Sequence, residues 1–207
     1  MQTSLFDSPP IDRYRFEQEA TAQGFQAVAG IDEAGRGPLA GPVVAAAVIL
    51  PVGLRINGVN DSKQLSAHQR EQLFKQITAT ALTIGIGRVD AATIDRINIL
   101  QATRLAMLQA VEALTIQPDR LLIDGISTID LPVPQLTIKQ GDSLSASIAA
   151  ASIIAKVTRD RLMADYDTQY PLYGFIRHKG YGSQQHLEAL RLHGPCPIHR
   201  RTFRGVR

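Results

Sequence analysis

The 207-residue chain is predicted to be an α/β protein with a mixed five-stranded sheet flanked by helices. Three short apolar segments, at residues 25–31, 43–50 and 82–89, have the length and composition of half-buried or buried strands. Two further strand-like segments follow at 120–124 and 134–139, each next to a helical pattern. Strands and helices in this order pack as a sheet with helices on its faces.

Helical patterns occupy the intervals between these strands: residues 66–80, 98–114, 145–166 and 183–192. Ser66 and Asn98 precede the first two segments and are suitable N-cap residues, because their side-chain oxygens can accept from free backbone N–H groups. Within residues 98–114 the apolar side chains recur at helical spacing. The third segment contains neither glycine nor proline, which predicts one long helix.

Composition limits the class of protein. Hydrophobic residues make up 44% of the chain, enough for a sizeable core. The single cysteine, Cys196, excludes an internal disulfide and suits a reducing compartment. The longest strictly apolar run, residues 43–50, is far shorter than the ~20 residues that span a bilayer. The first residues lack the apolar core of a secretory signal, so we expect a soluble, cytoplasmic protein without membrane contact.

Positive charge is concentrated at the C-terminal end. Residues 177–207 contain a single acid, Glu188, and seven basic residues: Arg177, Lys179, Arg191, Arg200, Arg201, Arg204 and Arg207. Such a segment can neutralise phosphates and release counterions. The alternative is a solvated tail that only keeps the protein soluble.

Acidic residues close several of the predicted strands. Asp32 and Glu33 end the first strand, Asp124 ends the fourth, and Asp142 lies where the fifth gives way to the long helix. Strand ends can meet at one edge of a sheet, and oxygen ligands suit Mg²⁺ or Mn²⁺. Two such ions would hold the attacking water and the leaving oxygen of a phosphodiester. Because clustered carboxylates repel one another without cations, the pattern predicts a metal-dependent enzyme.

Each acid also has a structural interpretation. Asp124 and Gly125 can form a turn, Asp142 can be a helix N-cap, and Asp32 with Glu33 can be a capping or turn pair. Neighbouring residues on a regular strand point to opposite faces, so Asp32 and Glu33 cannot share one metal there. We therefore expect the first strand to break at Asp32.

A glycine-flanked arginine follows the acidic pair, at Gly35, Arg36 and Gly37. The segment lacks the Gly-Lys-Ser/Thr ending of a Walker motif and no helical pattern follows, which excludes that kind of nucleotide site. Glycines let the backbone approach a ligand closely, and backbone groups can contact the 2′-hydroxyl that distinguishes RNA from DNA. The alternative is an ordinary tight turn.

Seven segments, in order and covering nearly all of residues 30–203, resemble the ribonuclease HII family: GIDEAGRGPLAGPVVAAAVIL (30–50), NDSKQLS (60–66), INILQAT (97–103), LLIDG (121–125), GDSLSASIAAASIIAKVTRD (141–160), YGFIRHKGYGS (173–183) and HRRTF (199–203). The resemblance implies an RNase H-like fold with a C-terminal helical extension. It divides the chain into an N-terminal leader and helix (1–24), an RNase H-like catalytic domain (25–170) and a basic substrate-binding extension (171–207).

The family cleaves the RNA strand of RNA–DNA hybrids. It also nicks duplex DNA on the 5′ side of a single embedded ribonucleotide, leaving 3′-OH and 5′-phosphate ends. The resemblance therefore implies a Mg²⁺- or Mn²⁺-dependent endonuclease that removes ribonucleotides from DNA during replication and repair, with a two-metal site when substrate is bound.

Site residues carry over position by position. The family's catalytic and metal-binding acids match Asp32, Glu33, Asp124 and Asp142. Asp32, Asp124 and either Glu33 or Asp142 would hold the metals, and the remaining acid would orient water or assist product release. The substrate-binding residues are Gly35, Arg36 and Gly37 at the RNA–DNA junction and Tyr181, stacked on the deoxyribose 3′ of the ribonucleotide or, alternatively, a half-buried ring in a glycine-rich loop. Lys63 is the next candidate, as a phosphate contact or simply a surface lysine.

One departure from the family pattern concerns Gln140. The family usually has Lys-Gly-Asp at the fourth acid, whereas this chain has Lys139, Gln140, Gly141 and Asp142. The carboxylate is retained, but a neighbouring lysine is not in its usual place.

Competing interpretations remain open at this level. Ribonuclease HIII is disfavoured because the ~30 residues before Asp32 are too few for that family's N-terminal domain. A non-catalytic nucleic-acid-binding module would rely on the basic tail alone and would gain nothing from acids facing phosphates. A zinc site at His193, Cys196 and His199 lacks a fourth ligand. We expect a monomer, and residues 2–8 are either a candidate sliding-clamp peptide or a disordered leader.

Overall fold

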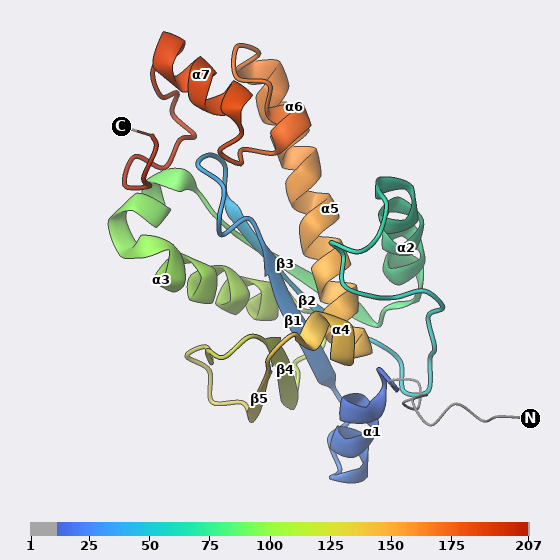
Figure 1. Ribbon diagram of the computed structural model, residues 1–207. Helices are drawn as coiled ribbons and strands as arrows, with labels where there is room; N and C mark the ends of the chain where they lie inside the picture. Colours follow the sequence, from blue (N-terminus) through green and yellow to red (C-terminus); the bar gives the residue numbers. More distant parts are fainter. Residues whose placement is uncertain (1–11, 207) are drawn as a thin grey trace, which may run out of the picture.

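The computed structural model describes residues 12–206, and over this part of the chain it has the predicted mixed sheet with helices on both faces (Figure 1). The strand order is β3-β2-β1-β4-β5. Strand β2 is antiparallel to both neighbours, whereas β1, β4 and β5 run parallel. The strands are β1 (Val28–Ala34), β2 (Val43–Ile49), β3 (Thr83–Val89), β4 (Arg120–Asp124) and β5 (Gln135–Ile138).

The helices form two layers around this sheet. In Figure 1, α5 and α2 lie on one side of it and α3 on the other. Two apolar clusters, one on each face, form the core. The helices are α1 (Arg15–Ala22), α2 (Ala67–Thr80), α3 (Ala91–Glu112), α4 (Gly141–Leu144), α5 (Ala146–Gln169), α6 (Phe175–His178) and α7 (Gln184–His193).

Strand β2 explains why the sheet needs cover on both faces. All seven of its residues are buried, and they alternate between the two clusters. Ala45 and Ala47 pack on the α3 side, and Ala46 and Val48 on the α5 side, as the two-residue repeat of a strand requires. Gly30 of β1 lets α5 approach closely, because a Cβ there would overlap the backbone of Ser147.

Most predicted boundaries are confirmed. Ser66 caps α2 in a reciprocal capping box with Gln69, and Ser145 caps α5. Helix α3 begins at Ala91, earlier than expected, and is interrupted at Asn98, whose φ is 66°. The Asn98 carboxamide oxygen then accepts from two backbone N–H groups, so it caps the second segment as predicted. The short helices α4 and α6 were not anticipated.

The expected break of the first strand at Asp32 is wrong. Strand β1 continues through Asp32 and Glu33 to Ala34, because these residues pair in regular antiparallel register with β2. Only the pairing with β4 ends there, at the partners Ile31 and Ile123. Beyond Ile31, the backbone hydrogen bonds that keep β1 regular thus come from β2.

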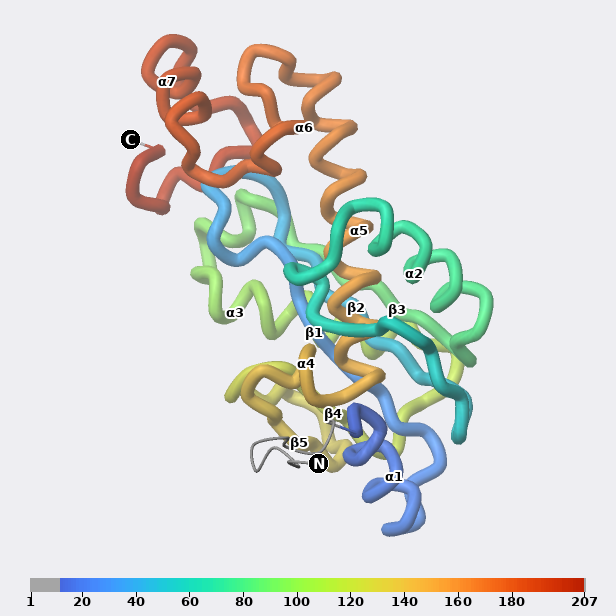
Figure 2. Tube along the Cα trace, turned by 45° about the vertical axis from the view of Figure 1, so that its right-hand side comes forward, coloured from blue at the N-terminus to red at the C-terminus, as the bar shows by residue number. Residues whose placement is uncertain are grey.

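The C-terminal residues pack at one end of α5, against the turn between β1 and β2 (Figures 1 and 2). Ala40 of this turn forms an isolated antiparallel bridge with His199. The Leu39 N–H donates to the Gly180 carbonyl at 2.8 Å. Three segments distant in sequence therefore form one structural unit. Across residues 12–206, no helix combines the length and apolar character needed to cross a bilayer.

Candidate active site

The sheet brings the predicted acids to one edge. Strands β1 and β4 are adjacent and parallel, and their register pairs Ile31 with Ile123. The next residues, Asp32 and Asp124, therefore lie beside each other where the two strands stop pairing. Asp142 is the second residue of α4, which begins three residues after the end of β5. We call Asp32, Glu33, Asp124 and Asp142 the acidic edge.

Asp32 is the most enclosed of these acids, at 3% exposed. One of its carboxylate oxygens accepts from the Glu33 backbone N–H at 2.7 Å, and the Ser152 hydroxyl of α5 also donates to it. Burial raises the pKa of Asp32 well above its usual range, and the charges of Glu33 and Asp124 raise it further. The carboxylate is thus held in place without enough positive charge to stabilise its ionised form.

Glu33 is held by the arginine of the glycine-flanked segment. Its carboxylate lies 3.2 Å from a guanidinium nitrogen of Arg36. Burial raises the pKa of Glu33, Arg36 lowers it in part, and the charge of Asp124 raises it. Asp124 therefore lies close enough to perturb both acids of β1.

Asp124 and Asp142 are positioned by the turn before α4. The Gly141 N–H donates to the Asp124 carboxylate at 2.7 Å, and Gly125 follows with a φ of +94°. The N-cap interpretation of Asp142 is wrong: the cap position of α4 is Gln140, in the left-handed region, and Ser145 caps α5. Asp142 is 6% exposed, and burial, followed by the charges of Asp61 and Asp124, raises its pKa.

Lys63, predicted to contact phosphate, lies at the acidic edge. Its ammonium is 3.4 Å from the Asp142 carboxylate and 3.9 Å from Asp61. Burial lowers the pKa of Lys63, but the charges of Asp142, Asp61 and Asp32 outweigh burial and raise it. Sequence reasoning did not identify Asp61 as part of the site, although it lies two positions before Lys63 in the segment NDSKQLS (60–66).

The donor chemistry of this edge suits a hard divalent cation, because the side chains supply carboxylate oxygens. The raised pKa values of Asp32, Glu33 and Asp142 fit a site that lacks positive charge. Over residues 12–206, no three His, Cys, Asp or Glu side chains already form a metal-binding group. The fit is therefore one of donor type and charge, without preformed coordination.

The segment Gly35–Gly37 is held by two buried arginines that sequence reasoning missed. Arg200 is fully buried, and its guanidinium donates to the carbonyls of Gly35, Arg36 and Gly41. Arg200 therefore neither belongs to a solvated tail nor has N–H groups free for a phosphate, because it is buried and donates to backbone carbonyls. Arg207 lies outside the described residues.

Arg159 of α5 supports the other end of the same turn. It is 1% exposed and donates to the carbonyls of Pro42, Ala40 and Lys179 at 3.0–3.1 Å. Gly35 has a φ of +95°, and a Cβ there would collide with the Arg159 side chain. We call Arg159 and Arg200 the arginine brace.

Tyr181 lies beside the glycine-flanked segment, as its predicted joint role requires. A Cβ added at Gly37 would meet a ring carbon of Tyr181 at 3.6 Å. The tyrosine is 51% exposed, so about half of it is accessible to a ligand. The structure thus brings Gly37 and Tyr181 together, although 144 positions separate them in the sequence.

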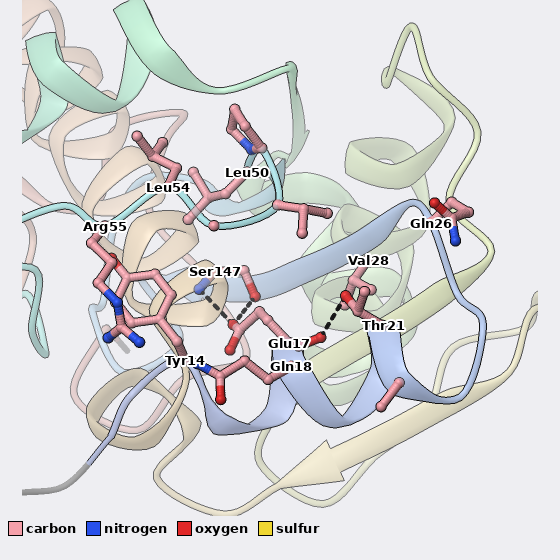
Figure 3. Close-up of a pocket in the computed structure, with 14 residues that line it drawn as sticks. Tyr14, Glu17, Gln18, Thr21, Gln26, Val28, Leu50, Leu54, Arg55 and Ser147 are labelled. Atoms are coloured by element: carbon pink, nitrogen blue, oxygen red, sulfur yellow. Dashed lines mark hydrogen bonds between the residues drawn. The ribbon is translucent and has the colours of Figure 1, made fainter.

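A separate cavity of about 390 Å³ lies between α1 and the segment after β2 (Figure 3). None of the residues of the acidic edge lines it. Glu17, which does, accepts from the Ser147 backbone N–H at 2.9 Å and from the hydroxyls of Ser145 and Ser147 at 2.6 Å. These bonds fix the start of α5 against α1, directly after the helix that carries Asp142.

Comparisons with known proteins agree with this architecture. A model of the family described as ribonuclease HII matches residues 29–206. The ribonuclease HII of Geobacter sulfurreducens is 63% identical, over 100% of this chain and 96% of that protein. The ribonuclease HII of Geobacter metallireducens is 64% identical, over 100% of this chain and 98% of that protein.

Solved structures extend the likeness to the fold. Ribonuclease H2 from Pyrococcus horikoshii superposes with a TM-score of 0.73 at 29% identity, covering 87% of this chain and 95% of that one. RNase HII from Archaeoglobus fulgidus, solved as a complex with PCNA, has a TM-score of 0.68 at 26% identity, covering 80% and 87%. Bst-RNase HIII, solved with Mn²⁺, shares the fold at 21% identity and a TM-score of 0.67, covering 87% and 68%.

Proposed function

Because the chain belongs to the ribonuclease HII family, we propose that it nicks duplex DNA 5′ of an embedded ribonucleotide and hydrolyses the RNA strand of RNA–DNA hybrids. Membership makes it a type 2 ribonuclease H, a metal-dependent phosphodiester hydrolase. We further propose that the products carry 3′-OH and 5′-phosphate ends and that the protein takes part in ribonucleotide removal during DNA replication and repair. We also propose that it acts in the cytoplasm as a monomer.

The charge imbalance of the acidic edge carries this proposal. Among the described residues 12–206, its four carboxylates and Asp61 are accompanied by only two cations in ion-pair contact, Arg36 and Lys63. A fold gains nothing from such repulsion, whereas a site that takes up divalent cations requires it. This imbalance argues against the alternative of a non-catalytic nucleic-acid-binding module, which needs positive charge facing the phosphates.

Asp32, Asp124 and either Glu33 or Asp142 would hold Mg²⁺ or Mn²⁺, and the remaining acid would orient water or assist product release. When bound, the ions activate the attacking water and stabilise the leaving oxygen. The hydrogen bonds from Glu33 N–H to Asp32 and from Gly141 N–H to Asp124 keep these carboxylates oriented before substrate arrives. Lys63 would contact a phosphate next to the acids.

Substrate selection would occur on the adjacent surface. Gly35, Arg36 and Gly37 would contact the ribose 2′-hydroxyl through their backbone, and Tyr181 would stack on the deoxyribose that follows. The proximity of Gly37 to the half-exposed ring of Tyr181 supports this assignment. Residues 171–207 would form the substrate-binding extension beside the catalytic part at residues 25–170, with 1–24 as leader and helix.

The test is a DNA duplex with one ribonucleotide, incubated with Mg²⁺, Mn²⁺ or chelator. We expect one nick on the 5′ side of the ribonucleotide in either metal and none with chelator. A protein that binds the duplex in a salt-sensitive way, but never cuts it at any metal concentration, would instead be the binding module.

A sliding-clamp partner is a second, weaker proposal. The Archaeoglobus fulgidus RNase HII was solved in complex with PCNA, which supports looking for a clamp contact here. The candidate peptide, residues 2–8, lies outside the described residues. A pull-down of a clamp by residues 1–10 is the direct test.

A further inference from the structure

Tyr181 rests on a buried chain of histidines that the proposed chemistry does not use. His186 is fully buried and His199 is 2% exposed. The His186 Nδ1 lies 2.8 Å from the Tyr181 carbonyl oxygen, and its Nε2 lies 2.9 Å from Nε2 of His199. The Cys196 backbone N–H points at Nδ1 of His199 at 3.0 Å. We call Cys196, His199, His186 and Tyr181 the histidine relay.

The proton positions in this relay follow from its tyrosine end. A carbonyl oxygen only accepts, so Nδ1 of His186 must carry a proton and donate to Tyr181. If His186 is neutral, its Nε2 carries none and accepts. The Nε2 of His199 must then carry a proton and donate it to Nε2 of His186. Because neutral His199 has one ring proton, its Nδ1 is an acceptor.

The other end of the relay requires the same arrangement. A backbone N–H only donates, so the Cys196 N–H needs an acceptor at Nδ1 of His199. The Cys196 thiol, 3.1 Å from the same nitrogen, can donate to it as well, and the Cys196 carbonyl is more distant at 3.3 Å. Two fixed backbone groups, at opposite ends, thus select one tautomer for each ring.

Burial keeps both rings neutral, as this arrangement demands. It lowers the pKa of His186, and it lowers the pKa of His199 to about 4. A third ring, His178, stacks on His186 with centroids 4.5 Å apart. His178 accepts from the Gly180 N–H at 3.2 Å, so the residue before Tyr181 is held as well.

We propose that His186 is a positioning residue for Tyr181: through the histidine relay it sets the place of an exposed ring that selects the RNA–DNA junction. The inference rests on the proposed function, because it requires Tyr181 to face the substrate. A core with only a packing role could use apolar side chains here. Instead a directional chain of hydrogen bonds ends on the carbonyl of Tyr181.

The first test is made on the unmodified protein. Nitrogen-15 NMR of the histidine rings distinguishes the two neutral tautomers and the charged form. We expect His186 to carry its proton on Nδ1 and His199 on Nε2 at pH 7. The opposite tautomer at either ring would overturn the relay, whatever any variant does.

The second test uses two variants that separate the ends of His186. In His186→Asn the amide nitrogen replaces Nδ1, so the bond to Tyr181 is kept. In His186→Gln the amide oxygen replaces Nε2 and accepts from His199, so only the contact with His199 is kept. The readout is the ratio of kcat/KM on the single-ribonucleotide duplex to kcat/KM on an all-RNA hybrid, which is independent of the folded fraction. His68→Gln, on the exposed face of α2, is the control.

We expect His186→Gln to lower this ratio about five- to tenfold, the effect of one lost hydrogen bond, while His186→Asn and His68→Gln keep it near wild type. Equal ratios for the two His186 variants would overturn the proposal. Tyr181→Ala separates the two levels of the argument. If it leaves the ratio unchanged, junction sensing itself fails; if it lowers the ratio and His186→Gln does not, only the relay fails.

Discussion

The acidic edge and the arginine brace lie on either side of the same β1–β2 turn and treat buried charge in opposite ways. At the edge, the carboxylates outnumber the neighbouring cations, and burial together with their mutual repulsion raises the pKa values of Asp32 and Asp142. At the brace, Arg159 and Arg200 are almost completely buried, yet within residues 12–206 neither forms an ion pair.

The difference lies in what completes each region. The guanidiniums of the brace are surrounded by backbone carbonyls, to which their N–H groups donate. Burial lowers the pKa of Arg159 to about 10 and that of Arg200 to about 9, so both stay charged at neutral pH. The brace is therefore complete within the chain. The acidic edge keeps a mutual repulsion that cations or protons from outside can remove.

The largest expected effect comes from breaking the acidic edge. Asp124→Asn keeps the shape of the side chain but removes one charge from the metal-binding set. We expect cleavage of the single-ribonucleotide duplex to fall below detection. The melting temperature in chelator should stay the same or rise, by about 2–4 °C for each kcal/mol of repulsion removed.

The matched control for this variant is Asp130→Asn, which changes an exposed aspartate away from the edge. It should leave both turnover and melting temperature at wild-type values. Binding of Mn²⁺ measured by calorimetry gives a readout besides activity, and Asp124→Asn should weaken it. Near-normal turnover of Asp124→Asn would mean that Asp124 is only a turn residue.

A smaller effect is expected from breaking the brace while keeping its charge. Arg200→Lys retains the cation but cannot reach the carbonyls of Gly35, Arg36 and Gly41 together. We expect a loss of about 2–4 kcal/mol in the free energy of unfolding, because buried carbonyls lose their donors. Urea unfolding measures it, and exposed Arg191→Ala should cost under about 0.5 kcal/mol. A lysine variant as stable as wild type would show that charge, and not the planar fork, holds the turn.

The two regions also differ in how far sequence could reveal them. Asp32 and Asp124 stand at the ends of apolar segments, so local pattern alone placed them at a sheet edge. Arg159 and Arg200 carry no such signal: Arg159 lies within the predicted helix 145–166 and Arg200 belongs to a basic stretch, and charged residues in both settings are typical of solvated surface. Their burial is decided by the β1–β2 turn, which is distant in sequence.

The same reasoning explains the wrong strand end. The opposite directions of neighbouring side chains on a regular strand suggested a break at Asp32, but β1 continues because β2 returns beside it and pairs as far as Ala34 with Val44. Ser66 and Asn98, by contrast, were predicted correctly because a cap is a contact within a few residues. Local chemistry was sufficient for caps and strand interiors, and insufficient wherever a partner strand or a buried guanidinium set the outcome.

The acidic edge and His199, which precedes Arg200 of the brace in sequence, should finally titrate with opposite signs. The folded pKa of His199, about 4, lies below the ordinary 6.5, so the folded state binds fewer protons than the unfolded state between these values. The stability that it contributes is complete above pH 6.5 and is lost as pH falls toward 4, up to about 3 kcal/mol. Asp32, whose folded pKa is raised, contributes stability at low pH that is lost as pH rises.

Urea unfolding in chelator between pH 7.5 and pH 4.5 separates these contributions. His199→Gln keeps a donor toward His186 but cannot titrate, so it should lose less stability than wild type as pH falls. His68→Gln, which changes an exposed ring, should follow the wild-type curve. Parallel curves for wild type and His199→Gln would mean that the pKa of His199 is the same in the folded and unfolded states. The fold would then not favour the neutral ring that the histidine relay requires.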